Sequence, residues 1–161
     1  MNRHTRNYKR RRHNLIVVIM VIIVVIIVSV LIDILLAYSA VYKYIDVRYN
    51  FSPDNVETNF KERYGYFTDE LRDSIAPEEQ EEIIRQVHNN QLVSRLESYD
   101  ISLLKYNAGY SIFKVSIKAG YYDNDIEISS YEYSFITTIE HRMLFKHLIQ
   151  NIELLNDVHD H

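Results

Sequence analysis

Residues 15–38 read LIVVIMVIIVVIIVSVLIDILLAY, and this run decides the architecture of the chain. From Leu15 to Ile32 the only polar side chain is Ser29, and isoleucine and valine fill 14 of these 18 positions. A bilayer core needs about 20 apolar residues in a helix. Because hydrocarbon offers no partner for the amide groups of a lone strand, a single span must be helical. The run therefore predicts one transmembrane helix over residues 15–38.

A basic tail precedes this run. Residues 1–14 hold six arginine or lysine residues and no acidic residue, whereas the rest of the chain holds 12 basic and 22 acidic residues. Basic residues beside a span stay on the cytoplasmic side of the membrane. We therefore expect the tail in the cytoplasm and residues from about 40 onward outside. A buried helix of a soluble domain is disfavoured, because nothing else in the chain is large enough to surround a helix that is apolar on every face.

A cleaved signal peptide is the other reading of the same run. Ala37, Tyr38 and Ser39 place small residues before Ala40 at positions that suit cleavage. However, the run is longer than the about 7–15 apolar residues of a signal peptide, and Asp33 interrupts it. We therefore expect an uncleaved signal anchor in the cell membrane.

Asp33 lies 18 residues past Leu15, which is about 27 Å along a helix. We expect its carboxylate near the outer interface, within reach of headgroup water. A contact with a cationic group on a partner's helix is the alternative, since carboxylates inside membranes often mark function. Tyr38, Tyr42 and Tyr44 follow, and are expected to form an aromatic belt at that interface. The residues expected to mark membrane topology are Arg10, Arg11, Arg12, Asp33, Tyr38 and Tyr42.

Beyond the span, the sequence predicts a short stalk over residues 39–52 and one compact domain over residues 53–158. Three helices are expected at the start of this domain, over residues 53–64, 69–75 and 77–96. Ser52 suits the N-cap of the first helix, and Val56, Phe60 and Tyr64 share one face of it. Thr68 suits the N-cap of the second helix, and Pro77 begins the third.

The periodicity then changes from helical to strand-like. Strands are expected over residues 99–106, 110–119 and 126–137, with turns at 107–109 and 123–125. In the second strand, Phe113, Val115 and Ile117 alternate with polar residues, so one face is buried and the other is wet. Thr137 and Glu140 form a possible capping box, which predicts a last helix over residues 141–155. Its expected apolar stripe consists of Leu144, Leu148, Ile152 and Leu155.

The expected fold class is therefore α+β. A single N-terminal transmembrane helix is followed by a small domain of two or three helices, a three-stranded antiparallel sheet and a C-terminal helix. Helices on one face of such a small sheet are needed to bury enough apolar surface.

The sequence carries no signature of catalysis. There is no cysteine, and three glycines are too few for a glycine-rich phosphate loop. No nucleophile motif or zinc signature is present, and no carboxylates are paired as acid and base. The terminal run DVHDH at residues 157–161 holds metal-binding side chains, but a chain terminus is not preorganised for a metal. We expect no enzymatic activity, no catalytic residue, no cofactor and no metal site.

The partners expected from charge are lipids and proteins. The acidic domain would repel phosphate backbones, so we expect no nucleic acid. The basic tail suits anionic lipid headgroups. Other membrane or envelope proteins are expected as partners, with a homo-oligomer as an open alternative.

The order of elements resembles the inner-membrane scaffold subunit of type IV secretion systems. The counterparts of that subunit in Gram-positive conjugation carry a similar domain of the nuclear-transport-factor type. The resemblance rests on layout and on no motif, and the expected closing helix departs from a fold that usually ends in strands. Minor pilins share the outline but not the cleavage site or the early glutamate, and phage-encoded exclusion proteins share it too. The resemblance implies a structural subunit of an envelope assembly, such as a conjugation or secretion machine. The alternative is a stand-alone membrane-anchored binding or inhibitory module.

Overall fold

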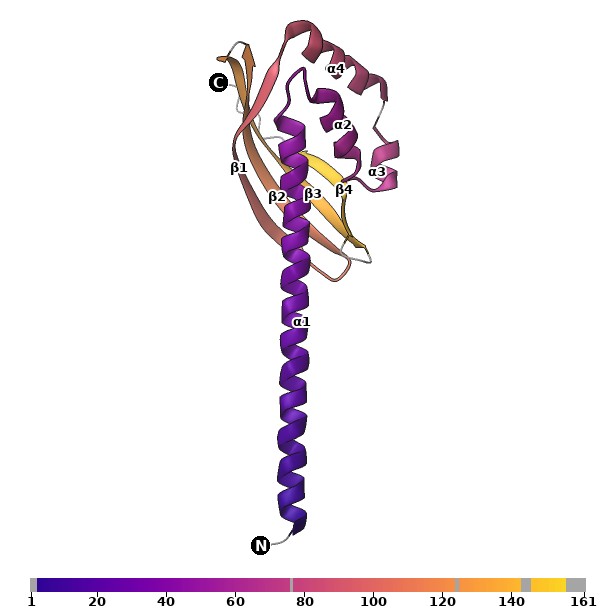
Figure 1. The fold of residues 1–161 in the computed structure, drawn as a ribbon, viewed down its shortest axis with the longest axis vertical. Coiled ribbons are helices and arrows are strands. Elements are labelled where there is room, and N and C mark those ends of the chain that lie inside the picture. Colours follow the sequence, from indigo (N-terminus) through magenta and orange to yellow (C-terminus); the bar gives the residue numbers. More distant parts are fainter. Residues whose placement is uncertain (1–2, 76, 124, 143–145, 156–161) are drawn as a thin grey trace. The chain divides into compact units, whose positions relative to one another are not determined.

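The computed structural model describes the backbone of residues 3–75, 77–123, 125–142 and 146–155, and the side chains of these residues except 3–12 and 77–79 (Figure 1). The chain divides into two compact units, residues 1–35 and residues 36–161. The helices are α1 (Arg3–Tyr49), α2 (Val56–Tyr64), α3 (Asp69–Asp73) and α4 (Pro77–Asn90). The strands are β1 (Val93–Tyr106), β2 (Tyr110–Asp123), β3 (Ile126–Arg142) and β4 (Lys146–Leu155).

The first unit consists of the N-terminal part of α1. Among the described residues, one helix, His13–Tyr49, is long and apolar enough to cross a membrane, with a mean hydropathy of 3.9 in its most apolar window. The side chains from Leu15 to Val28 are exposed on all sides of this helix. An apolar helix without a buried stripe matches the expectation of a membrane span.

The C-terminal part of α1 belongs to the second unit and lies in its core. Val41, Tyr44 and Ile45 are fully buried, and they pack in one cluster with the apolar residues of the sheet. The stalk expected over residues 39–52 is therefore wrong for residues 39–49, which continue the helix. The sequence pattern allowed this reading because these residues are mixed in polarity. Their buried apolar members lie at helical spacing, as in a helix that packs one face on a core.

Three short helices follow α1 and confirm the expected order. Val56 and Phe60 of α2 are buried on one face, as predicted, but the helix begins at Val56 and its N-cap is Asn55 rather than Ser52. Thr68 caps α3 as expected, since its hydroxyl accepts a hydrogen bond from the amide of Leu71. The third helix was predicted to reach residue 96, but α4 ends at Asn90 and β1 begins three residues later.

The sheet is antiparallel, with the strand order β1-β2-β3-β4 (Figure 1). Phe113, Val115 and Ile117 are buried as predicted, and their neighbours across β3 are Thr137, Phe135 and Tyr133. The buried face of the sheet packs against the end of α1, while Lys114 and Lys118 on the other face are exposed. The turn expected at 107–109 separates β1 from β2 as predicted, whereas the turn expected at 123–125 includes residue 124, which lies outside the described residues.

The sheet has four strands instead of the predicted three. The C-terminal helix predicted over residues 141–155 is wrong. Residues 146–155 form β4, which pairs with the second half of β3. Thr137 does not begin a helix, because it lies inside β3 and its hydroxyl donates to the carbonyl of Asn151. A bulge at Gln150 explains the helical appearance of the sequence. The extra residue puts Ile149 and Ile152, three apart, on the same face.

Bulges occur at several places in this sheet. In β1, Leu96 and Ser98 pair with adjacent residues of β2, so Glu97 between them is an extra, unpaired residue. Leu104 is a second extra residue of β1. Gln150 is the extra residue of β4, and Ile128 that of β3. Because each bulge bends its strand and increases its twist, the sheet curves around the helices that pack on it.

Candidate functional site

A cavity of about 490 Å³ lies between the buried face of the sheet and the helices of the second unit. Its walls come from the end of α1, from α2 and α4, and from β2 and β3. The lining residues are Arg48, Tyr49, Phe51, Phe60, Arg63, Ile83, Gln86, Val87, Leu92, Tyr121, Tyr131 and Tyr133. A volume of this size is typical of sites for small organic molecules.

Arg63 is the most buried charged residue of this cavity. The side chain of this α2 residue is 9% exposed, and its Nε atom has no hydrogen-bond partner among the described residues. The guanidinium carbon lies 4.3 Å from the ring centroid of Phe60, so the cation rests on an aromatic face. Burial, and then the nearby charge of Arg48, lower the pKa of Arg63.

Arg48 brings a second guanidinium group into the same cavity. Its Nη1 atom donates a hydrogen bond of 2.6 Å to the hydroxyl of Tyr44, and its guanidinium carbon lies 5.4 Å from the ring centroid of Tyr49. Both tyrosines belong to the buried side of α1. These contacts hold the half-buried Arg48 side chain along the core rather than in solvent.

Tyrosine rings form the sheet side of the cavity. The rings of Tyr131 and Tyr133 stack with centroids 5.9 Å apart, and Tyr121 lies 5.3 Å from Tyr131. Burial raises the pKa of both Tyr131 and Tyr133 to about 12. A tyrosine hydroxyl is protonated at neutral pH even at its ordinary pKa of about 10, so each of these groups keeps its O–H.

The cavity has no acidic side chain in its lining among the described residues. Neither Arg48 nor Arg63 forms an ion pair with a described carboxylate. A buried cation beside a half-buried one, without a counter-charge, is unfavourable, because the loss of hydration is not repaid. The arrangement can bind an anion.

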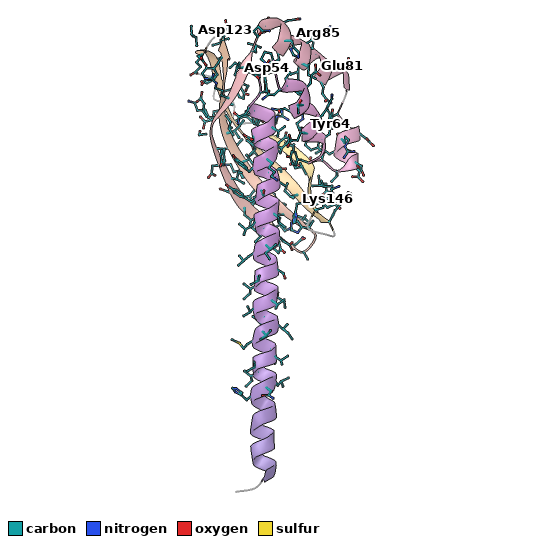
Figure 2. All side chains as sticks on the ribbon, viewed as in Figure 1. Asp54, Tyr64, Glu81, Arg85, Asp123 and Lys146 are labelled. Carbon is teal, nitrogen blue, oxygen red and sulfur yellow. The ribbon has the colours of Figure 1, made fainter. Side chains whose placement is uncertain are left out.

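A second hollow of about 510 Å³ lies between α2 and α4. Figure 2 shows the side chains of these helices, with Tyr64 labelled on α2 and Glu81 and Arg85 on α4. The lining of this hollow carries both signs of charge, from Glu57, Lys61, Glu81 and Arg85. This mixed lining has no charge preference comparable to that of the first cavity.

The residues expected to mark membrane topology do not meet in one site. Arg10, Arg11 and Arg12 have helical backbone, but their side chains lie outside the described residues. Asp33 lies in the first unit and is partly exposed. In the second unit, Tyr38 and Tyr42 are each 38% exposed, which leaves their place in an aromatic belt a prediction.

Tyr44 does not belong to such a belt, and its assignment there was wrong. Its ring is 1% exposed and packs in the domain core against Phe67. The remaining predictions on the chain terminus fall on residues 156–161, which lie outside the described residues. No group of three or more metal-ligating side chains occurs in the described part of the chain.

The cavity arginines were missed in the sequence, although a signal for each exists. Val56, Phe60 and Arg63 are spaced i, i+4 and i+7, so Arg63 lies on the apolar face of its helix. Arg48 follows Tyr44 by four residues on the buried side of α1. An arginine at an apolar position of a helical repeat indicates a buried cation, and both fit that rule.

No family model matches the chain, and no curated protein matches it in sequence. Solved structures do match its fold. A periplasmic fragment of TraM superposes with a TM-score of 0.53 at 11% identity, over 74% of this chain and 94% of that one. An IcmL-like type IV secretion system protein from Legionella pneumophila superposes with a TM-score of 0.55 at 12% identity, over 73% of this chain and 88% of that one. At such identities the likeness shows a shared fold.

Proposed function

We propose that the chain is a non-enzymatic, single-pass membrane protein whose extracytoplasmic domain is a structural subunit of an envelope assembly. A conjugation or type IV secretion-like machine is the proposed kind of assembly. The fold likeness carries this proposal, since one similar structure is a periplasmic fragment and the other belongs to a type IV secretion system. The helix long enough to span a membrane supports it.

The proposed orientation follows from charge. The basic tail stays in the cytoplasm, residues 15–38 cross the membrane as an uncleaved signal anchor, and the acidic domain lies outside. Lipid contacts the span, and anionic headgroups contact the tail. A homo-oligomer is compatible with this arrangement.

Exposed apolar side chains on β1 support a role in protein contacts. Tyr99, Leu103 and Leu104 are large apolar side chains that are 41–54% exposed on this edge strand. Exposed apolar groups gathered on one element are typical of interaction surfaces. The proposed contact partners are other membrane or envelope proteins.

Site-specific crosslinking in the source cells tests the scaffold role. A photo-crosslinking amino acid at Leu104 should capture defined partners, identified by mass spectrometry as proteins of a transfer or secretion apparatus. The matched control carries the same crosslinker at Lys114, on the exposed face of β2. Equal capture at both positions, or capture of unrelated proteins alone, would contradict the proposal.

The alternative is a stand-alone anchored module that binds a ligand or inhibits a process, and the cavity favours it. Replacement of residues 15–32 by a leucine run of equal length separates the two functions. A scaffold whose span docks onto neighbours loses its assembly, whereas a stand-alone module keeps its function on any anchor. Transfer or secretion genes beside the gene for this chain support the scaffold, and an isolated position in a phage supports the module.

A further inference from the structure

The cavity between the sheet and α2 combines two features that belong together in a ligand site. One is a pair of guanidinium groups, from Arg48 and Arg63, without a described acidic neighbour in the lining. The other is an aromatic wall. The rings of this wall come from Tyr49, Phe51, Phe60, Tyr121, Tyr131 and Tyr133.

The guanidinium of Arg63 interacts with the hydroxyl of Tyr64, but its Nε donor has no partner among the described residues. The side chain is nine-tenths buried, lines the cavity, and has an Nε donor without a hydrogen-bond partner among the described residues. A buried unsatisfied donor costs free energy, and a charged one costs more. An anion placed against this donor would remove that cost and would also offset the repulsion between Arg63 and Arg48.

The shape of the donors selects the kind of anion. A guanidinium group presents its N–H groups in a planar fork, which matches the oxygens of a carboxylate or phosphate. The Phe60 ring, whose centroid lies 4.3 Å from the guanidinium carbon, supports the Arg63 fork from one side. The hydroxyls of Tyr131 and Tyr133 also line the cavity, and each can donate a hydrogen bond to an anion.

The remaining walls select the body of the ligand. Phe51, Phe60 and Val87 are buried apolar residues, and the tyrosine rings continue the same surface. Ile83 lines the cavity and is 42% exposed, so the cavity opens to solvent beside α4. A small molecule can enter there without unfolding the domain.

From these features we infer that the cavity binds a small organic anion with a carboxylate or phosphate head and an aromatic or apolar body. The head lies against Arg63 and Arg48, and the body lies against the aromatic wall. This binding activity does not depend on the scaffold role, because it uses only residues inside the cavity. It gives the domain a ligand whose negative charge offsets the repulsion between the two guanidinium groups.

Fluorine NMR on the full chain in phosphatidylcholine nanodiscs tests the inference. The probe is 4-(trifluoromethyl)benzoate, and its neutral isostere is 4-(trifluoromethyl)benzamide. Empty nanodiscs correct for partition into lipid. We expect saturable line broadening of the benzoate, with the benzamide binding at least about tenfold more weakly because it lacks the charge. Equal binding of the two probes would overturn the inference.

Variants assign the binding to the cavity. Arg63→Gln should weaken benzoate binding by at least about tenfold, and Arg63→Lys by less, because the charge is kept but the fork is lost. The matched control is Arg72→Gln, since Arg72 is an exposed arginine of α3 that pairs with Asp69 at 3.4 Å. Benzoate binding that is equally lost in Arg72→Gln, or unchanged in Arg63→Gln, contradicts the inference.

A second variant keeps the test decisive if Arg63→Gln does not fold. Ile83→Trp places a larger side chain at the solvent-exposed mouth, where the fold tolerates it, and should block benzoate binding. Retained binding in this variant argues against the cavity. Competition with phenyl phosphate distinguishes the two heads. If phenyl phosphate displaces the benzoate probe at a concentration lower than that of the probe, a phosphate ester is the better ligand. If displacement needs more phenyl phosphate than probe, a carboxylate is the better ligand.

Discussion

The ring of Tyr44 in α1 lies against the ring of Phe67, with centroids 5.5 Å apart and planes at 54°. Phe67 in turn forms a bridge with Ile149 of β4, and both side chains are fully buried. One aromatic contact thus joins the C-terminal part of α1 to a residue that pairs with the last described strand of the sheet. The end of α1 is therefore part of the domain rather than a connector to it.

Tyr44→Ala should destabilise the domain by about 3–5 kcal/mol, as aromatic truncations in packed cores do. The same change at Tyr38, which is 38% exposed, is the matched control and should cost less than about 0.5 kcal/mol. Pulse proteolysis of the full chain in micelles across a urea series measures both. Similar midpoints for the two variants would mean that Tyr44 does not support the core.

The absence of cysteine allows a clean test of orientation. We predict that Ser129→Cys, on exposed β3 backbone, reacts with a membrane-impermeant maleimide in intact spheroplasts. Thr5→Cys, in the basic tail, should react only after lysis, because basic residues hold the tail inside. The reverse labelling pattern would invert the proposed topology.

Asp33→Leu should leave membrane insertion intact, because the substitution lengthens the apolar run and removes a charge near its outer end. Extraction with alkaline carbonate should leave the variant in the membrane pellet, like the parent chain. Function should weaken only if the span docks onto a neighbouring helix through this carboxylate. Release of the variant into the soluble fraction would show that Asp33 anchors the span.

The buried tyrosines predict an alkaline loss of stability. Burial raises the pKa of Tyr131 and Tyr133 to about 12 in the folded domain, whereas the unfolded side chain titrates near its ordinary value of about 10. Between these values the unfolded state has lost protons that the folded state keeps, so stability is complete below about pH 10 and falls as pH rises toward 12. The phenolate absorbance of the folded chain should therefore show a late-titrating fraction.

Tyr133→Phe should reduce that late fraction and make the loss of stability with pH less steep. The chain unfolded in guanidinium is the control, where all 14 tyrosines should titrate together near pH 10. A folded chain that completes its titration with the unfolded one would show that these hydroxyls are open to water.

Local periodicity was sufficient to predict part of the fold. The alternation through Phe113, Val115 and Ile117 identified β2 and its buried face, and the turn at 107–109 fixed the first hairpin. Thr68 was recognisable as a cap because its role is local. These features depend on neighbours in the sequence, which a single chain displays.

Features that depend on distant contacts were misread. Gln150 breaks the alternation of β4, and only its pairing with β3 reveals a strand. The cavity was missed for a similar reason, since Arg48 and Arg63 are 15 residues apart in the sequence and meet only in the fold.

The bulges of the sheet have a consequence for how copies of this domain can gather. Both outer strands carry them, with Glu97 and Leu104 in β1 and Gln150 in β4. A strand edge with regularly spaced, unpaired N–H and C=O groups can pair with a strand of another copy and so start a fibre. A bulge interrupts this spacing and hinders such pairing. Copies of this domain would thus resist pairing edge to edge into fibres, and any contact between them would run through side chains rather than through backbone hydrogen bonds.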